Sequence, residues 1–253
     1  MQFTFDCHVH TTRSACGENI TDEWLSEQAL NGFSFAVTDH SMHMYYEPEI
    51  AWALLREDSV ELFAERVQTG RDNTLRYIED IRGCNRDHMH VGVELDVMYN
   101  GQIMLADDLR DQLDIIVGGV HFLPTIAHEA PLPEIIDQFQ AETLWLLEYG
   151  VDVLAHPFRI LRGKDLPVDD DLVHWTVEQA QKHGAALEIN SHKIIREHDL
   201  LMTKLALERG LKLAIGTDAH NTREFGGFTY HQEILQAAGV QPDQLNSLLF
   251  ALN

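Results

Sequence analysis

The chain has 253 residues, of which 45% are hydrophobic, and this is enough to bury one substantial core. Its 18 basic residues stand against 41 acidic ones, and the net charge of −23 repels polyanions, so extended DNA or RNA is not expected as a partner. A small phosphorylated substrate remains compatible, because bound divalent cations would reverse the potential locally. We predict a single domain over residues 1–253.

Seven strand–helix units are predicted in chain order, without an internal repeat. The predicted strands cover residues 3–7, 34–37, 90–95, 115–120, 151–154, 186–189 and 213–215. The best-marked helices, each ending at or near a glycine, cover residues 22–30, 133–149, 169–183 and 197–209. Regular alternation with buried, β-branched strands predicts an α/β fold, in which a parallel sheet closes or nearly closes into a barrel.

The connection between the second and third predicted strands, residues 41–86, is longer than usual. Its opening part, residues 41–56, has two interpretations. It is either a lid whose Tyr45, Tyr46 and Trp52 pack against an apolar or aromatic substrate group, or a plain loop. The later part is predicted to be an amphipathic core helix with inward-facing residues at Leu62, Phe63, Val67, Leu75 and Ile78.

No apolar stretch approaches the roughly 18 residues of a membrane span, and the N-terminus lacks the pattern of a signal peptide. The three cysteines form neither a CxxC pair nor an even framework. We therefore expect a cytoplasmic protein without disulfides and without a membrane partner. The sequence does not indicate an oligomeric state.

Every predicted strand is followed by a polar group of the kind that binds metals. Active sites of such barrels lie at the carboxyl ends of the strands. One histidine after a strand is usually a surface or capping residue, but seven groups in register favour a multinuclear metal site. They are His8 and His10, Asp39 and His40, Glu94 and Asp96, His121, His156, Asn190 and His192, and Asp218 and His220.

The spacing within these groups makes chemical sense. Residues i and i+2 of a strand face the same side, so His8 and His10, like Asp218 and His220, can direct two side chains into one cavity. Imidazole nitrogen suits Zn²⁺, Fe²⁺ and Mn²⁺, and a carboxylate can bridge two ions about 3.5–4 Å apart. Glu94, at the end of an apolar segment, is the best candidate for the bridge.

Together, these segments resemble the polymerase and histidinol phosphatase (PHP) superfamily of metal-dependent phosphoesterases. The resemblance extends over nearly the whole chain and implies a distorted, TIM-like (β/α)7 barrel with two or three divalent metal ions, Zn, Fe or Mn. The segments are HVHT at 8–11, TDH at 38–40, GVELD at 92–96, GGVHF at 118–122, AHP at 155–157, EIN at 188–190 and GTDAH at 216–220.

The resemblance also allots the ligands. One ion would take His8, His10, Glu94 and Asp218; a second would share Glu94 and add His121 and His156; a third would use His40 and His220. Members of the superfamily with three metals usually supply one more histidine after the first motif, and this chain does not. Cys16 and Glu18 are the available substitutes, and a free Cys16 without a metal role is the alternative.

The expected reaction is hydrolysis by a metal-bridging hydroxide, with Glu94 and Asp218 as the carboxylates on which it depends. The proton for the leaving group would come from His192, His43 or a metal-bound water. Arg159, Arg196 and Lys193 are candidates for gripping the phosphate, with plain surface residues as the alternative interpretation.

We therefore expect a phosphatase of a small phosphomonoester. L-histidinol phosphate fits if Glu47 or Glu49 complements its amine. The alternatives are a phosphodiesterase or nuclease-type module acting on nucleotides or nucleic-acid ends, and an inactive metal-binding domain. A nuclease should carry a basic groove, and the acidic composition argues against it.

Overall fold

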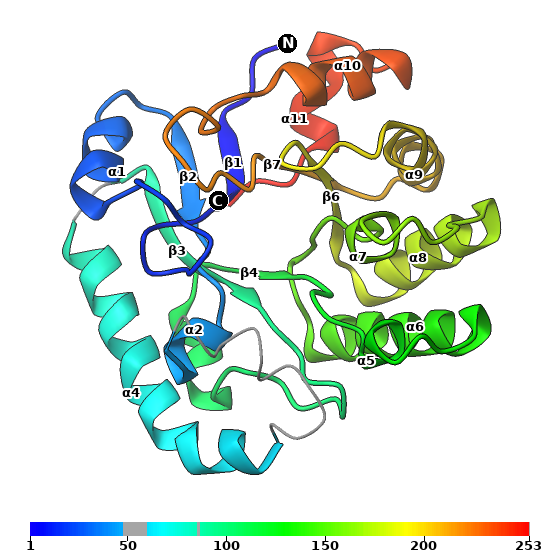
Figure 1. Ribbon diagram of the computed structural model, residues 1–253. Coiled ribbons are helices and arrows are strands. Elements are labelled where there is room, and N and C mark those ends of the chain that lie inside the picture. The colour runs from blue at the N-terminus through cyan, green and yellow to red at the C-terminus, as the bar shows by residue number, and fades with distance from the viewer. Residues whose placement is uncertain (48–59, 85–86, 253) are drawn as a thin grey trace.

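Seven parallel strands curl into a nearly closed barrel with the helices around it, in a computed structural model that describes residues 1–47, 60–84 and 87–252 (Figure 1). The strands are hydrogen-bonded in sequence order, as expected for repeated strand–helix units. The predicted α/β barrel is confirmed. Within the described residues, no helix has the length and apolar content needed to cross a bilayer.

The strands lie close to their predicted places, and their residues are buried because one face meets the barrel interior and the other meets the helices. Three strands differ by two residues. The first begins and ends two residues later than predicted, so that His8 lies inside it, the fourth ends two residues earlier, and the fifth begins two residues later. The bounds are β1 Phe5–Val9, β2 Ser34–Val37, β3 Met89–Leu95, β4 Ile115–Gly118, β5 Val153–Leu154, β6 Ala186–Asn190 and β7 Leu213–Gly216.

Three of the four best-marked helices end at the predicted glycine, whereas α1 ends at Ala29 with Leu30 as its C-cap. Thr21 and Asp169 accept a hydrogen bond from the backbone N–H three residues on, and Gly150, Gly184 and Gly210 end their helices in the left-handed region. The helices are α1 Asp22–Ala29, α2 Met42–Tyr45, α4 Val60–Gly83, α5 Pro124–Ala127, α6 Leu132–Tyr149, α7 Arg159–Arg162, α8 Asp170–His183, α9 Arg196–Arg209, α10 Thr229–Ala237 and α11 Leu245–Leu248, with short 3₁₀ helices η2 Asp107–Gln112 and η3 Pro242–Gln244.

The two ends of the sheet meet next to the candidate site. The backbone N–H of Asp218 donates to the carbonyl of His8 at 2.8 Å, and the N–H of His10 donates to the carbonyl of Ala219 at 3.0 Å. Below them, the Asp6 carboxylate accepts from the Thr217 N–H at 3.0 Å and from its hydroxyl at 2.6 Å. These bonds hold the first and last groups of predicted ligands side by side, although more than 200 residues separate them in the chain.

The predicted role of Tyr45 and Tyr46 in packing against a substrate is wrong. Both are buried, and the ring of Tyr45 lies 4.9 Å from that of Phe63, on α4. The short helix α2 therefore packs its aromatic residues into the core. Trp52, Glu49 and the rest of the possible lid after residue 47 lie outside the described residues. The predicted core helix is confirmed as α4, with Phe63 and Ile78 buried and Leu75 partly buried, whereas Val67 is 41% exposed instead of facing inward. The side chain of Leu62 lies outside the described part of the structure.

A buried carboxyl group joins α9 to α10. The Tyr230 hydroxyl donates to Asp199, and burial raises the pKa of this carboxyl from its usual 3.8 to about 7. The folded protein therefore holds a proton on Asp199 at pH values where the unfolded chain has already released it.

We expect Asp199→Asn to gain stability relative to the wild type as the pH rises from 5 to 8. Over this pH range the wild type should lose on the order of 3 kcal/mol of stability, because about two pH units of it lie below the folded pKa, and the neutral amide should not show this loss. Urea unfolding of both proteins at the two pH values measures this. A wild-type-to-variant difference that stays constant with pH would contradict the buried, protonated carboxyl.

Candidate metal centre

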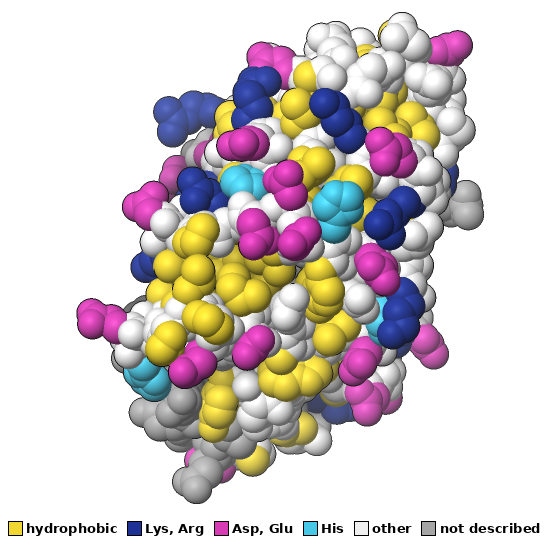
Figure 2. Space-filling model, turned by 90° about the vertical axis from the view of Figure 1, so that its right-hand side faces the viewer, with side chains coloured by type: hydrophobic (Ala, Val, Ile, Leu, Met, Phe, Trp, Pro, Cys, Tyr) yellow, Lys and Arg dark blue, Asp and Glu magenta, His cyan; other side chains and the backbone are white. Residues whose placement is uncertain are grey.

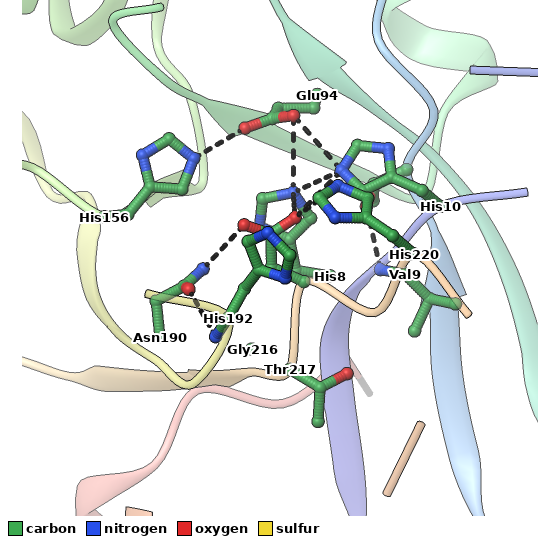
Figure 3. Close-up of polar contacts among 12 residues, drawn as sticks. His8, Val9, His10, Glu94, His156, Asn190, His192, Gly216, Thr217 and His220 are labelled. Carbon is green, nitrogen blue, oxygen red and sulfur yellow. Dashed lines mark hydrogen bonds and ion pairs between the residues drawn. The ribbon is translucent and has the colours of Figure 1, made fainter. Parts of the chain in front are cut away.

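Glu94, at the end of β3, is the point on which the predicted ligands converge (Figure 3). Its side chain is fully buried. The Oε1 atom lies 3.0 Å from His121 Nε2 and 2.8 Å from His156 Nε2. The Oε2 atom lies 3.1 Å from His40 Nδ1, 3.3 Å from His10 Nε2 and 3.4 Å from His8 Nε2. One carboxylate thus faces five imidazoles that come from the ends of four different strands, β1, β2, β4 and β5.

Asp218, just after β7, forms a second meeting point. Its Oδ1 atom lies 3.1 Å from His10 Nε2 and 3.3 Å from His220 Nε2, and its Oδ2 accepts from the Asn190 side-chain amide at 3.2 Å. Arg159 forms an ion pair with the same Oδ2. The structure therefore brings together all eight histidine and carboxylate residues that the sequence nominates as ligands.

The donor atoms fit divalent cations. Several triads offer ligand atoms within 4.8 Å of one another, among them His8, His10 and Glu94, and His40, Glu94 and His121. Glu94 Oε2 and Asp218 Oδ1 are buried without a hydrogen-bond donor, a costly condition that a cation would relieve. Imidazole nitrogens with carboxylate oxygens form a set that suits zinc, iron or manganese.

Both carboxylates are ionised despite their burial. Burial acts to raise the pKa of Glu94, but the imidazoles of His121, His40 and His8 outweigh it and hold that pKa well below its usual range. Burial likewise opposes ionisation of Asp218, and Arg159 followed by His8 holds its pKa well below the usual range. The site is therefore able to offer two charged oxygen ligands at neutral pH.

Glu188, on β6, is a functional residue that the sequence analysis missed. Its Oε1 accepts from His8 Nδ1 at 2.8 Å, and its Oε2 accepts from the His156 backbone N–H at 2.8 Å and from the Asn190 amide at 2.9 Å. It fixes His8 with Nε2 toward the centre. The available signal was a glutamate inside an apolar strand, two residues before Asn190 and hence on the same face.

Two aspartates hold the outer parts of the centre in the same way. Asp96 Oδ1 lies 2.9 Å from His121 Nδ1 and orients that ring. Asp39 accepts from the Thr11 N–H at 2.8 Å and from the Thr11 hydroxyl at 2.7 Å, which ties down the loop after β1. These contacts explain why polar groups other than ligands also occupy the strand ends.

The backbone is unusual at the centre. His156 and Asp218 have positive φ values of 27° and 51°, which side chains other than glycine rarely adopt. A Cβ atom at Gly119 would lie 2.8 Å from His156 Cε1 and 2.9 Å from His121 Cε1. Only glycine leaves room at this position, so the backbone after β4 lies directly against the ligands.

A pocket of about 420 Å³ opens onto the centre. His10 is fully buried and does not line the pocket itself. It lies behind His40 and His220, which do, and whose ring centroids are both 4.8 Å from that of His10. The candidate residues in its lining are Cys16, His40, His121, Arg159, His192, Lys193 and His220. Cys16 also groups with His10 and His40 as a triad able to hold an ion, whereas Glu18 is exposed.

Two of the nominated substrate residues lie away from this pocket. His43 packs behind His40, with ring centroids 5.3 Å apart, and its Nδ1 accepts from the Ala15 N–H at 3.2 Å. Arg196 pairs with Glu233 and lines a neighbouring pocket. By contrast, the His192 ring lies 4.2 Å from that of His220, and its Nδ1 lies 3.5 Å from Glu224.

Glu188→Gln should weaken metal binding by about 10–100-fold, because an amide cannot accept from both His8 and His156. Competition with a chelator measures the affinity. Glu178→Gln, at an exposed position on α8, is the matched control and should retain wild-type affinity. Equal affinity of the Glu188 and Glu178 variants would show that Glu188 does not orient the ligands.

Comparison with known proteins gives a family match. The model of the PHP domain family matches residues 6–192, about three quarters of the chain. The match includes Glu94 and the histidines up to His156. Asp218 and His220 lie beyond the matched segment, although the structure places them at the same centre.

Curated relatives are distant in sequence. DNA polymerase/3'-5' exonuclease PolX of Bacillus subtilis is 27% identical over 225 residues, and the match covers 87% of this chain but 35% of that protein. A probable phosphatase of Shewanella oneidensis is 27% identical over 256 residues, covering 97% of this chain and 87% of that one. A probable phosphatase of Syntrophotalea carbinolica is 24% identical, covering 95% and 90%.

Among solved structures, one similar fold is that of histidinol phosphate phosphatase from Lactococcus lactis, in complex with zinc, L-histidinol and phosphate. The TM-score is 0.53, and the alignment covers 94% of each chain at 12% identity. At this identity the likeness concerns the fold.

Proposed function

This chain belongs to the PHP domain family of metal-dependent phosphoesterases, and from that premise we propose that it hydrolyses a small phosphomonoester at a centre of two or three divalent ions. The observation that carries the proposal is the convergence of six histidines on Glu94 and Asp218 beside an open pocket. The pocket, about 420 Å³, suits a small molecule better than a polymer.

Bound divalent ions would supply Lewis acidity, which lowers the pKa of water and neutralises charge on the phosphate oxygens. In this proposal Glu94 would serve two ions, one with His8, His10 and Asp218 and one with His121 and His156. Glu188 and Asp96 hold two of these imidazoles in orientation through their second nitrogens. No serine or cysteine nucleophile is needed.

Arg159 and His192 would act on the substrate from the pocket wall. The guanidinium of Arg159 contacts both Asp218 and His156, so a permanent positive charge lies where phosphate oxygens would approach. Such a group binds phosphate bidentately. His192 lines the same pocket beside His220 and is our candidate for giving a proton to the leaving alkoxide.

We propose that Cys16 helps to hold the third ion, together with His40 and His220. Cys16 lies within ligand distance of His10 and His40, on the loop where the further histidine would be expected. Thiolate sulfur is a chemically sound zinc ligand, and binding to an ion would offset the burial that raises the pKa of this thiol.

Substitution of cobalt for the native metal should test Cys16 directly. We expect a thiolate-to-cobalt charge-transfer band that Cys16→Ser abolishes, together with a loss of about one bound ion per chain. Cys84→Ser, in the loop after α4, is the control and should keep the band. A spectrum that does not change in the Cys16 variant would leave Cys16 as a free thiol.

Two alternatives have specific support. The relation to PolX favours a phosphodiesterase or nuclease activity, but the net charge of −23 opposes binding of a polyanion. L-histidinol phosphate is favoured as a substrate by the fold shared with the histidinol phosphate phosphatase. Of the carboxylates nominated for its amine, Glu47 is exposed and Glu49 lies outside the described residues.

We expect the metal-loaded wild type to release phosphate from an aryl phosphate monoester faster than it cleaves the matched diester. Glu94→Gln should abolish release, because loss of the bridging charge removes a ligand from two ions, and elemental analysis should show less bound metal. Glu178→Gln, an exposed change of the same kind, should keep full activity. Preference for the diester would favour the nuclease interpretation, and bound metal without any turnover would favour an inactive domain.

A further inference from the structure

Basic side chains gather beside the metal centre out of proportion to their number in the chain. Of 18 lysines and arginines, five line two pockets at this rim, whereas among the acidic residues that the structure describes only Glu197 does. The five are Arg159, Arg162, Lys164, Lys193 and Arg196. They come from α7 and the residue pair after it, and from the segment that leads into α9.

The two pockets adjoin each other. The pocket of about 420 Å³ contains the candidate metal ligands, and the neighbouring one, about 320 Å³, contains none of them. Arg159, Gly163 and Lys193 line both, so the two share a wall. A molecule whose phosphate reaches the ions can therefore extend past Lys193 into the second pocket.

Three of the five cations lack an acidic partner. Within the described part of the chain, Arg162, Lys164 and Lys193 form no ion pair with a carboxylate, and Arg162 donates instead to the Leu166 carbonyl at 2.8 Å. Arg196, in contrast, pairs with Glu233 and lies over the Tyr230 ring. Around these pockets, positive charge is left uncompensated.

Unpaired cations also occur elsewhere on the described surface, for example Arg76 and Lys204, whereas Arg13 pairs with Asp22 and Arg71 pairs with Asp108. What sets this rim apart is that its unpaired cations lie together at two adjoining pockets. Figure 2 shows acidic, basic and apolar side chains interspersed over the face that carries α6, α8 and α9 in Figure 1. In a chain of net charge −23, a group of unpaired cations at one pocket reverses the local potential and attracts an anion.

We propose that the second pocket is an anion-binding subsite and that the substrate is a phosphomonoester with a second anionic group, a phosphate or a carboxylate, away from the scissile phosphate. Arg162, Lys164 and Lys193 bind this second group while the metal centre holds the first. The inference rests on the proposed function. It disfavours substrates with a cationic amine at that end, which these residues would repel.

Matched substrate pairs test the proposal and distinguish the two anionic groups. Fructose 1,6-bisphosphate against fructose 6-phosphate tests a second phosphate, and 3-phosphoglycerate against glycerol 1-phosphate tests a carboxylate. At constant ionic strength, we expect the substrate with two anionic groups, in at least one pair, to have a kcat/KM about tenfold or more above that of its partner. This is the effect of one charge-assisted contact. No preference in either pair would overturn the proposal.

Variants locate the effect. Lys164→Gln and Arg162→Gln should each raise the KM for the preferred substrate with two anionic groups. This increase should be about tenfold larger than the increase in KM for its partner, with kcat little changed. Lys164→Arg, which keeps the charge, should restore most of the difference. Lys204→Gln, exposed on α9 outside both pockets, should alter neither substrate. Equal effects on both substrates would contradict a separate subsite.

Binding measured without turnover separates this inference from the proposed function. Calorimetric titration of the metal-free protein with fructose 1,6-bisphosphate and with 3-phosphoglycerate should show binding of at least one of them that weakens in Lys164→Gln and not in Lys204→Gln. If no phosphomonoester is hydrolysed but this binding is seen, the subsite stands and the proposed function fails. If monoesters are hydrolysed but neither preference nor binding is found, the subsite fails and the proposed function stands.

Discussion

The burial of the Glu94 charge is the constraint on which the site depends. An ionised carboxylate removed from water is costly unless positive or hydrogen-bonding partners surround it. Here five imidazoles do so, and they come from strand ends distributed around the whole barrel. Because no local segment could supply such a shell, the charge is tolerable only after the barrel has closed.

The same residues therefore close the barrel and orient the predicted ligand side chains. The backbone bonds of His8 with Asp218 and of His10 with Ala219 join the ends of the sheet and also bring two groups of predicted ligands together. Glu188 accepts from one ligand side chain and from the backbone of another, so it serves both the packing of β6 and the geometry of the centre. Gly119 keeps the space that these side chains occupy. Changes that loosen the barrel should also loosen the metal site.

The sign of the charge differs between the outer surface, the pocket rim and the buried centre around Glu94. The chain as a whole is strongly acidic, the buried centre holds ionised carboxylates among imidazoles, and the rim carries most of its cations unpaired. An acidic exterior opposes large polyanions, whereas the rim favours small ones. The combination points to selection by the size of the anion, consistent with a small phosphorylated substrate.

Much of this arrangement could be predicted from the sequence, because a parallel barrel brings the carboxyl ends of its strands to one rim. The strand–turn pattern therefore indicates His8, His10, Glu94 and Asp218 as members of one site. The predictions that fail have physical reasons. Tyr45, for example, packs into the core because Phe63 of α4 lies against its ring.

The sequence by itself determined the fold class, the family resemblance and the set of candidate ligands, because each depends on residue type and local spacing. The tertiary structure decided which nitrogen faces which oxygen, that Glu188 supports His8, and that Arg162, Lys164 and Lys193 share one rim. These relations join residues from different strand–helix units. Their distances depend on how the barrel closes, and no local pattern in the chain specifies that.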